Sequence, residues 1–219
     1  MLKSSEISQE EIWDEIAKVW KGYRNVPVRE VARFLKKKKG KVLDLGCGSG
    51  RNLVRFKGEY YGVDFSEEMI KYAKEKAHLL KMKAFFEKSS IDNLSFESNF
   101  FDSAIFIDSL HCLENSASRR KSLQELFGVL KPGAEALISV WDKNQERFKN
   151  KGKETFVPWK VNYKTLDRYY YLYDKQELID LIKELKFEIV KIFEKPKKAL
   201  EKNYSQKSIK IIVAKPKLG

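Results

Sequence analysis

The chain has 219 residues, which is enough for one domain with a full hydrophobic core. Its two cysteines and two histidines show no CxxC spacing, which argues against a disulfide framework, and we expect no bound metal. It contains no run of eighteen apolar residues and no apolar signal core, so we expect a soluble, cytoplasmic protein that makes no membrane contact.

The net charge of +13 is unevenly distributed along the chain. Residues 1–142 carry 24 basic and 21 acidic side chains, whereas residues 143–219 carry 20 basic and 10 acidic ones. A basic third joined to a nearly neutral remainder indicates an anionic polymer as partner. A Lys- and Glu-rich composition of the hyperthermophile kind is the alternative, but it does not explain why the excess lies at one end.

Helical and strand patterns alternate along the chain. An N-terminal helical entry segment, residues 1–40, comes first, and Ser66 is placed to cap a later helix. The spacing of apolar residues predicts helices over 9–20, 28–36, 51–56, 66–73, 117–130 and 175–185, and strands over 41–45, 60–63, 84–87, 101–107, 136–141, 187–193 and 209–214.

A glycine-rich loop follows the strand at 41–45. Glycine permits positive φ and lets the backbone approach a ligand closely. The acid that ends the next strand, Asp64, is where a doubly wound sheet binds ribose hydroxyls. The spacing differs from G-x-G-x-x-G and resembles the D-x-G-x-G-x-G loop of Rossmann-like methyltransferases that use S-adenosylmethionine. This resemblance implies S-adenosylmethionine as cofactor, bound by Asp44, Gly46, Cys47, Gly48, Gly50, Asp64, Phe65, Ser90, Ile91 and Ile107.

The last two apolar runs have no helix between them, which predicts a hairpin. We therefore expect a single α/β domain over residues 1–219, with a Rossmann-like methyltransferase fold, a seven-stranded, mostly parallel sheet with an antiparallel last strand, and helices on both faces. Residues 142–174 show no clear period and are rich in lysine and aromatic residues. We expect them to form an irregular insertion on the substrate side of the sheet.

Three further segments carry a more specific resemblance. They are Trp13-Asp14-Glu15-Ile16-Ala17 with Trp20, Arg24 and Pro27; Leu110-His111 with Arg119-Arg120; and Phe156-Val157-Pro158-Trp159 with Arg168-Tyr169-Tyr170-Tyr171-Leu172-Tyr173. Together they resemble the tRNA methyltransferases that esterify 5-carboxymethyluridine at the wobble position, including the methyltransferase domain of the human AlkB-like tRNA enzyme. We expect an archaeal member. The chain departs from the pattern at Tyr171 and Cys112, where histidines are usual, and at Ser90, where an acid near adenine is usual.

The resemblance implies transfer of a methyl group to the carboxylate of 5-carboxymethyluridine in tRNA. A carboxylate is already nucleophilic at neutral pH, so the enzyme contributes orientation and electrostatics. Arginine suits the carboxylate, aromatic rings suit the base, and His111 offers one hydrogen bond with a charge tunable near neutral pH. We expect catalytic roles for Arg24, His111, Arg168 and Tyr169, and substrate binding by Arg119, Arg120, Trp159 and Tyr170.

Alternatives remain for both the residues and the function. Arg168 has Asp167 and Asp174 nearby as surface ion-pair partners, and the other site residues also have purely structural interpretations. The chain is alternatively a methyltransferase for a small carboxylic acid, quinone or polyketide, or a binding subunit without catalysis. Eukaryotic members of the family also imply a small zinc-binding activator, which would pair with an edge strand containing Phe85 and Phe86.

Overall fold

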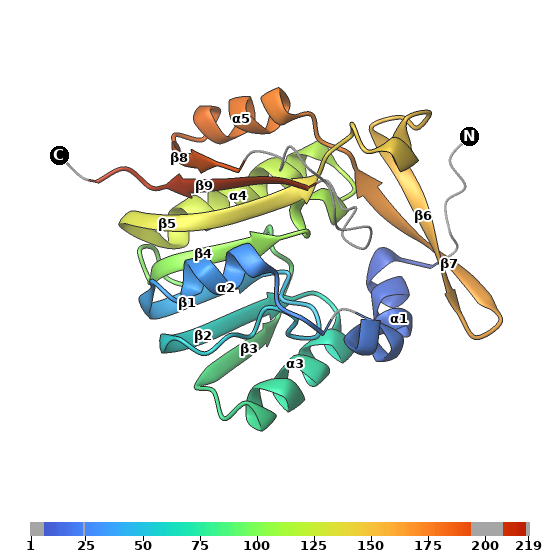
Figure 1. Cartoon of the computed structure of the whole chain (residues 1–219), viewed down its shortest axis with the longest axis horizontal. Helices are drawn as coiled ribbons and strands as arrows, with labels where there is room; N and C mark the ends of the chain where they lie inside the picture. The colour runs from blue at the N-terminus through green and yellow to red at the C-terminus, as the bar shows by residue number, and fades with distance from the viewer. Residues whose placement is uncertain (1–6, 24, 194–207, 218–219) are drawn as a thin grey trace.

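The computed structural model describes residues 7–23, 25–193 and 208–217. Within these residues, a seven-stranded sheet has the order β3-β2-β1-β4-β5-β9-β8 (Figure 1). β9 is antiparallel to both of its neighbours, and the pairs among the first five strands are parallel. The expected Rossmann-like sheet with an antiparallel last strand is therefore confirmed. The strands are β1 (Lys39–Leu45), β2 (Lys57–Asp64), β3 (Ala84–Lys88), β4 (Phe101–Ile107), β5 (Leu130–Trp141), β8 (Glu188–Ile192) and β9 (Ser208–Ala214).

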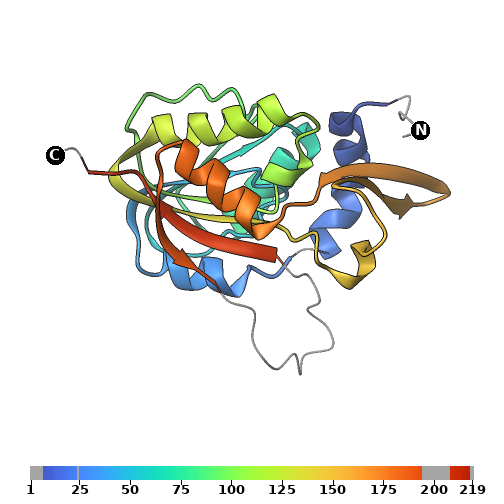
Figure 2. The ribbon, with the colours of Figure 1, turned by 90° about the horizontal axis from the view of Figure 1, so that it is seen from above.

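Helices cover both faces of the sheet (Figure 2). On one face, Leu35 packs near Ile105, and α3 begins at a serine cap in which Ser66 Oγ accepts the Met69 N–H at 3.1 Å, as the sequence predicts. On the other face, Leu123 packs in the main core. Among the described residues, no helix is both long and apolar enough to cross a membrane. The first face carries α2 (Arg29–Leu35) and α3 (Glu67–Leu79), and the second carries α4 (Ser116–Val129) and α5 (Lys175–Glu184).

A helix and a hairpin lie beyond the carboxyl ends of the sheet strands (Figure 1). They are α1 (Gln9–Tyr23) and the antiparallel pair of β6 (Glu154–Val161) with β7 (Lys164–Tyr171). The expectation of an irregular 142–174 segment is therefore wrong for its second half. Both faces of β7 are buried against different parts of the molecule, so aromatic residues occupy successive positions and hide the strand's alternation.

The expected helix at 51–56 is also wrong. Turns end at Asn52, an extended stretch follows, and β2 begins at Lys57, which leaves little chain for a helix. Leu53 is buried instead beside Ala77 of α3, and Arg55 donates to the carbonyl of Leu80. The helix predicted over 117–130 is α4, which ends at Val129, and β5 starts at the next residue, Leu130.

Asp44 of β1 lies in the core beneath the glycine loop. It is fully buried, and its Oδ2 accepts a hydrogen bond from the hydroxyl of Tyr60 on β2. Its Oδ1 has no hydrogen-bond partner among the described residues. Burial raises the pKa of Asp44 to about 7, an effect that the Tyr60 hydroxyl opposes and the nearby charge of Asp64 reinforces. A carboxylate in this place costs stability whenever it is ionised.

We predict that Asp44→Asn stabilises the ligand-free protein above pH 7. The folded-state pKa lies above the ordinary value, so the wild-type chain loses stability as pH rises towards 7, and the neutral amide does not. The shift of roughly three pKa units gives an upper bound of about 4 kcal/mol. Urea unfolding at pH 8 and pH 5 measures the difference. A gain that is equally large at both pH values would contradict the buried-charge explanation.

Candidate active site

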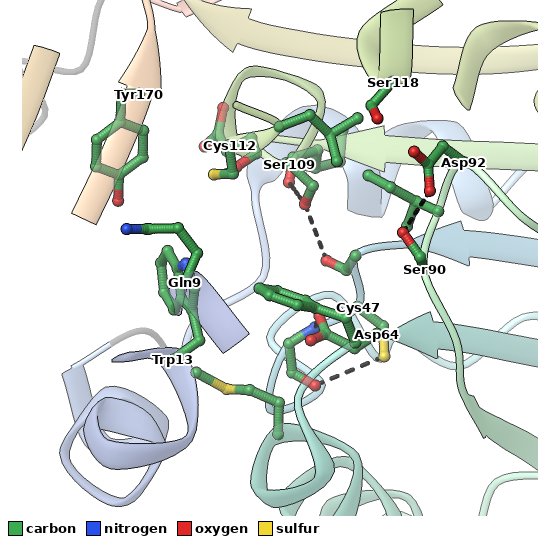
Figure 3. Close-up of a pocket in the computed structure, with 18 of the residues that line it drawn as sticks. Gln9, Trp13, Cys47, Asp64, Ser90, Asp92, Ser109, Cys112, Ser118 and Tyr170 are labelled. Atoms are coloured by element: carbon green, nitrogen blue, oxygen red, sulfur yellow. Dashed lines mark hydrogen bonds between the residues drawn. The ribbon is translucent and has the colours of Figure 1, made fainter. Parts of the chain in front are cut away.

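A cavity of about 310 Å³ opens at the carboxyl ends of β1, β2 and β4, between the sheet and α1 (Figure 3). Its volume is in the range of small-molecule sites, and doubly wound sheets bind ligands at this position. Figure 3 shows Ser90 and Asp92 on one side and Trp13 and Tyr170 on the other. We call these two sides the polar end and the aromatic end.

The glycine loop forms the wall of the cavity next to β1. Gly46, Gly48 and Gly50 all have left-handed backbone conformations. At Gly46, with φ of 68°, a Cβ would lie 2.4 Å from the Cβ of Ser109, so only glycine fits there. The hydroxyl of Ser109 also donates to the carbonyl of Gly46 at 3.1 Å, which holds the loop against the segment after β4.

Asp64, the last residue of β2, joins this loop to the start of α3. Its Oδ2 accepts the N–H of Gly48 at 2.8 Å, and its Oδ1 accepts the N–H of Ser66 at 3.1 Å. Burial raises the pKa of Asp64 to about 6, although these N–H groups act to lower it. The carboxylate borders the cavity, and because a carboxylate accepts about four hydrogen bonds, it retains capacity for a ligand.

Most residues expected to bind the cofactor line this cavity. Asp44 does not, because it lies beneath the loop with Tyr60. Gly50 also does not, and its N–H donates to the carbonyl of Cys47 at 3.1 Å to shape the turn. Those that line the cavity are Gly46, Cys47, Gly48, Asp64, Phe65, Ser90, Ile91 and Ile107.

The polar end contains an acid that the sequence reasoning missed. Asp92 lies two residues after Ser90, whose hydroxyl donates to Asp92 Oδ1 at 2.5 Å, and Ser118 stands beside them (Figure 3). Burial opposes ionisation of Asp92, but hydrogen bonds from Ser118 and Ser90 outweigh it and lower its pKa. An ionised carboxylate is therefore present at this end, although the position at Ser90 lacks one.

Arg168 on β7 is a buried cation behind the aromatic end, with 4% of its surface exposed. Its guanidinium lies 4.8 Å from the ring centre of Trp159 and 5.2 Å from that of Trp20, and Nη1 donates to the hydroxyl of Tyr170 at 2.8 Å. Trp20 and Tyr170 line the cavity. In the described part of the chain, Nε has no hydrogen-bond partner and no carboxylate forms an ion pair with Arg168. The alternative of a surface ion pair is therefore wrong.

His111 lies in the short 3-10 turn after β4 and is fully buried. Its Nδ1 accepts the N–H of Trp141 at 3.2 Å, so the neutral ring carries its proton on Nε2. This Nε2 has no hydrogen-bond partner among the described residues. Burial lowers the pKa of His111 to about 4, so the expected charge switch near neutral pH is wrong. The ring lies beside Trp141 and Tyr170 and does not line the cavity.

Tyr169 faces the opposite side of β7 from Arg168, because successive strand residues alternate. Its hydroxyl accepts from Nη1 of Arg119 at 3.4 Å. Arg119 also donates to the carbonyl of Leu113 at 2.8 Å, and its guanidinium lies 3.9 Å from the ring centre of Tyr171. The structure does not bring Tyr169 or Arg119 to the cavity wall; they connect the hairpin to the loop before α4.

The remaining predicted site residues are spread out. Arg120 makes a bidentate ion pair with Glu184 on the exposed surface, at 2.7 Å for both bonds, so the structure does not bring it to the cavity. Trp159 packs edge-on against Trp20 at 5.2 Å between ring centres, beside Arg168. Arg24 lies outside the described residues.

Sequence reasoning also missed what α1 contributes. Gln9, Trp13 and Trp20 line the cavity, although the helical spacing of the two tryptophans indicated only a core face. Their place in the family-like N-terminal segment was the available signal. Cys112, noted above only as a departure from the family pattern, also lines the cavity. Other lining residues without any local signal are Asn52, Asp108, Ser109, Leu113, Asn115, Ser118 and Trp141.

The donor set of the cavity fits S-adenosylmethionine. Asp64 offers carboxylate oxygens for ribose hydroxyls, Asp92 offers an acceptor for the amine of adenine, and the glycine wall leaves room for the methionine portion. In the described part of the chain, no group of three or more His, Cys, Asp or Glu residues forms a metal-binding cluster.

Sequence comparison relates the chain to known methyltransferases. A family model described as a methyltransferase domain matches residues 36–177. A tRNA (carboxymethyluridine(34)-5-O)-methyltransferase of Arabidopsis thaliana is 33% identical over 138 residues, which are 62% of this chain and 33% of that protein. A 2-phytyl-1,4-naphtoquinone methyltransferase of Trichormus variabilis is 32% identical over 162 residues, 70% of this chain and 62% of that protein. The chain thus spans a third of the first relative's length and less than two thirds of the second's.

Solved structures of low identity share the fold. A SAM-dependent methyltransferase from Methanosarcina mazei aligns with a TM-score of 0.71 and 21% identity over 88% of this chain and 100% of the other. A putative methyltransferase of Haloferax volcanii, solved with the Trm112 methyltransferase activator, gives a TM-score of 0.70 at 16% identity, over 97% and 99% of the two chains. The family model covers more than half of this chain, which therefore belongs to the methyltransferase-domain family, with S-adenosylmethionine as the expected cofactor.

Proposed function

We propose that the chain methylates the carboxylate of 5-carboxymethyluridine at the wobble position of tRNA, giving the methyl ester. The observation that carries this proposal is the buried guanidinium of Arg168, which has an unpaired Nε and no anionic partner among the described residues. A buried cation without a counter-charge is costly, and aromatic faces offset only part of that cost. An anionic substrate group entering at the aromatic end would supply the missing partner.

Other buried donors near Arg168 strengthen this argument. His111 Nε2, Trp141 Nε1 and Trp159 Nε1 are buried and lack acceptors among the described residues. A carboxylate is an acceptor-only group with two oxygens, so it suits a surplus of donors. The guanidinium fork of Arg168 holds such a group in a fixed orientation.

The reaction needs little from the protein beyond placing the substrate carboxylate next to the methyl group of the cofactor. When bound, the cofactor supplies a sulfonium methyl group: the bond from sulfur to carbon breaks, a bond from a carboxylate oxygen to carbon forms, and both charges are neutralised. Arg168 orients the carboxylate, and Tyr170, stacked on Trp141 at 4.0 Å between ring centres, offers a face beside the base.

Two classes of relative bear on the substrate. The Arabidopsis protein named for carboxymethyluridine in tRNA supports the proposal, as does the basic segment 143–219. The naphtoquinone methyltransferase supports a small-molecule substrate as the second candidate. Supplying labelled S-adenosylmethionine with either bulk tRNA or a small-molecule extract, followed by nucleoside analysis, separates the two.

An activator protein is part of the proposal. β3 is at an edge of the sheet, and Phe85 on it is 46% exposed and stacks on Tyr61 at 4.9 Å between ring centres. An open strand edge with an exposed aromatic residue is suited to pairing with a strand of another protein. The Haloferax structure is a complex of a putative methyltransferase with the Trm112 methyltransferase activator, which supports an activator protein as partner here.

We predict that Asp64→Ala weakens cofactor binding about tenfold to a hundredfold, because hydrogen bonds to a charged group each contribute roughly 1.5–3 kcal/mol. Isothermal titration calorimetry with S-adenosylmethionine measures the effect. Asp180→Ala on the exposed face of α5 is the matched control, and it should leave affinity unchanged. Equal affinities for Asp64→Ala and wild type would show that Asp64 does not bind the cofactor.

We predict that Arg168→Lys lowers the turnover of carboxymethylated tRNA about tenfold to a thousandfold, a loss of roughly 1.4 to 4 kcal/mol in transition-state stabilisation. Lysine keeps the charge but loses the planar fork. Cofactor affinity should stay within about threefold. Arg120→Lys is the control, because Arg120 pairs with Glu184 away from the cavity. Full activity of Arg168→Ala would contradict the proposal.

We predict that replacing Lys151 and Lys160 by Gln weakens tRNA binding and flattens its salt dependence. Both lysines are exposed; Lys160 lies on β6 of the hairpin, and Lys151 precedes this strand. Each tRNA phosphate that no longer has a lysine beside it should reduce the slope of log K against log salt by about 0.7–0.9. Lys36→Gln with Lys37→Gln, at the end of α2, is the charge-matched control. An unchanged slope would indicate that the excess of basic residues in segment 143–219 reflects overall composition and not tRNA binding.

A further inference from the structure

Gln9, the first residue of α1, binds the backbone of β7 on both sides of Arg168. Its Oε1 accepts the N–H of Tyr169 at 2.9 Å, and its Nε2 donates to the carbonyl of Asp167 at 3.2 Å. A carboxamide side chain carries the same donor and acceptor as a peptide group. Gln9 therefore pairs with β7 as one residue of a neighbouring strand would.

The strand pairing in the hairpin explains why the outer edge of β7 is free to bind Gln9. β7 has a partner strand on one side only, because it belongs to a two-stranded sheet with β6. Pro158 of β6 stands opposite Asp167 and has no N–H to donate, which suits a position without ladder bonds. The backbone groups of Asp167 and Tyr169 point to the outer edge, where Gln9 meets them.

The same helix is fixed to the cofactor side of the cavity. Asp14 of α1 accepts hydrogen bonds from the Ser66 hydroxyl at 2.5 Å and the Glu68 N–H at 3.2 Å. Ser66 also donates its N–H to Asp64. Less than two turns of α1, from Gln9 to Asp14, thus separate a contact with the Asp64 region from a contact with the backbone on both sides of Arg168.

We propose that Gln9 is a positioning residue that sets where the Arg168 guanidinium lies relative to the bound cofactor. This inference rests on the proposed function, because it assumes that Arg168 holds the methyl acceptor. A displacement of about 1 Å is enough to cost on the order of a hundredfold in rate, and Arg168 has no ion pair in the described residues to hold it.

The test is a double-mutant cycle between Gln9 and Arg168. Gln9→Met keeps the size of the side chain and removes both hydrogen bonds, and we expect it to lower kcat on carboxymethylated tRNA about tenfold to a hundredfold with S-adenosylmethionine affinity unchanged. In the Arg168→Lys background the same change should cost less than about twofold, because the two residues act as a unit. An equal loss in both backgrounds, as a direct contact of Gln9 with substrate would give, overturns the proposal.

Two additional variants control for folding. Gln176→Met removes an exposed side-chain hydrogen bond on α5 and should change nothing. Gln9→Glu keeps the acceptor for the Tyr169 N–H but faces the Asp167 carbonyl, so its loss should be intermediate. If Gln9→Met unfolds below the temperature of the assay, Gln9→Glu serves as the test instead. A Gln9→Glu variant as active as wild type would contradict the proposal.

Tryptophan fluorescence separates this inference from the proposed function. The chain has four tryptophans, and Trp13, Trp20 and Trp159 surround Arg168 while Trp141 stacks on Tyr170. We expect Gln9→Met and Arg168→Lys each to shift the emission, and the double variant to add nothing further. If wild-type enzyme esterifies no tRNA, the proposed function fails while this readout still reports on positioning. An emission spectrum unchanged by Gln9→Met would overturn the positioning role.

Discussion

The carboxylate of Asp64 is the constraint on which the site depends. It accepts the Gly48 N–H of the loop after β1 and the Ser66 N–H at the start of α3. Two segments that meet at the carboxyl ends of the strands therefore share one acceptor. Ser66 in turn donates its hydroxyl to Asp14 of α1. A continuous line of hydrogen bonds therefore runs from the loop beneath the cavity to the helix above it. Gln9 of the same helix binds the backbone of β7 in the hairpin.

Buried charged side chains in this region reduce the stability of the protein. Asp44 has an unpaired oxygen under the loop, and Arg168 has an unpaired nitrogen behind the aromatic end. Apolar residues of similar size would fold at lower cost in both places. Such conflicts between burial and charge gather at functional sites, because a ligand of the right charge relieves them.

Local patterns predicted the sheet and the glycine loop, because both depend on residues adjacent in sequence. The strand-loop spacing around Gly46 and the acid at Asp64 were recovered, and both residues border the cavity. The hairpin was not recovered, since Arg168 and Tyr169 are both buried, on opposite faces, and the alternation of a strand disappears. Pairings such as Arg120 with Glu184 join α4 to α5 across the fold, and no spacing rule anticipates them.

Individual site residues show the same limit of prediction from sequence. Asp92 supplies the carboxylate that Ser90 lacks, but only the turn that brings Ser90, Asp92 and Ser118 together reveals it. His111 was expected to carry a charge tunable near neutral pH, yet its charge depends on burial, which the sequence does not contain. The pKa lowered to about 4 follows from its place between Trp141 and Tyr170.

The state of His111 bears on which nucleophile the site favours. A phenol or quinol hydroxyl must lose a proton as it attacks, so its methylation benefits from a general base near neutral pH. His111 does not suit that role, because Nδ1 already accepts from Trp141 and Nε2 carries the proton. Asp108 borders the cavity, and its Oδ1 accepts the Ser139 hydroxyl at 2.5 Å, so one of its two oxygens is already engaged. A carboxylate needs no base and gains from the unpaired cation of Arg168, so the aromatic end favours an acceptor that arrives already ionised.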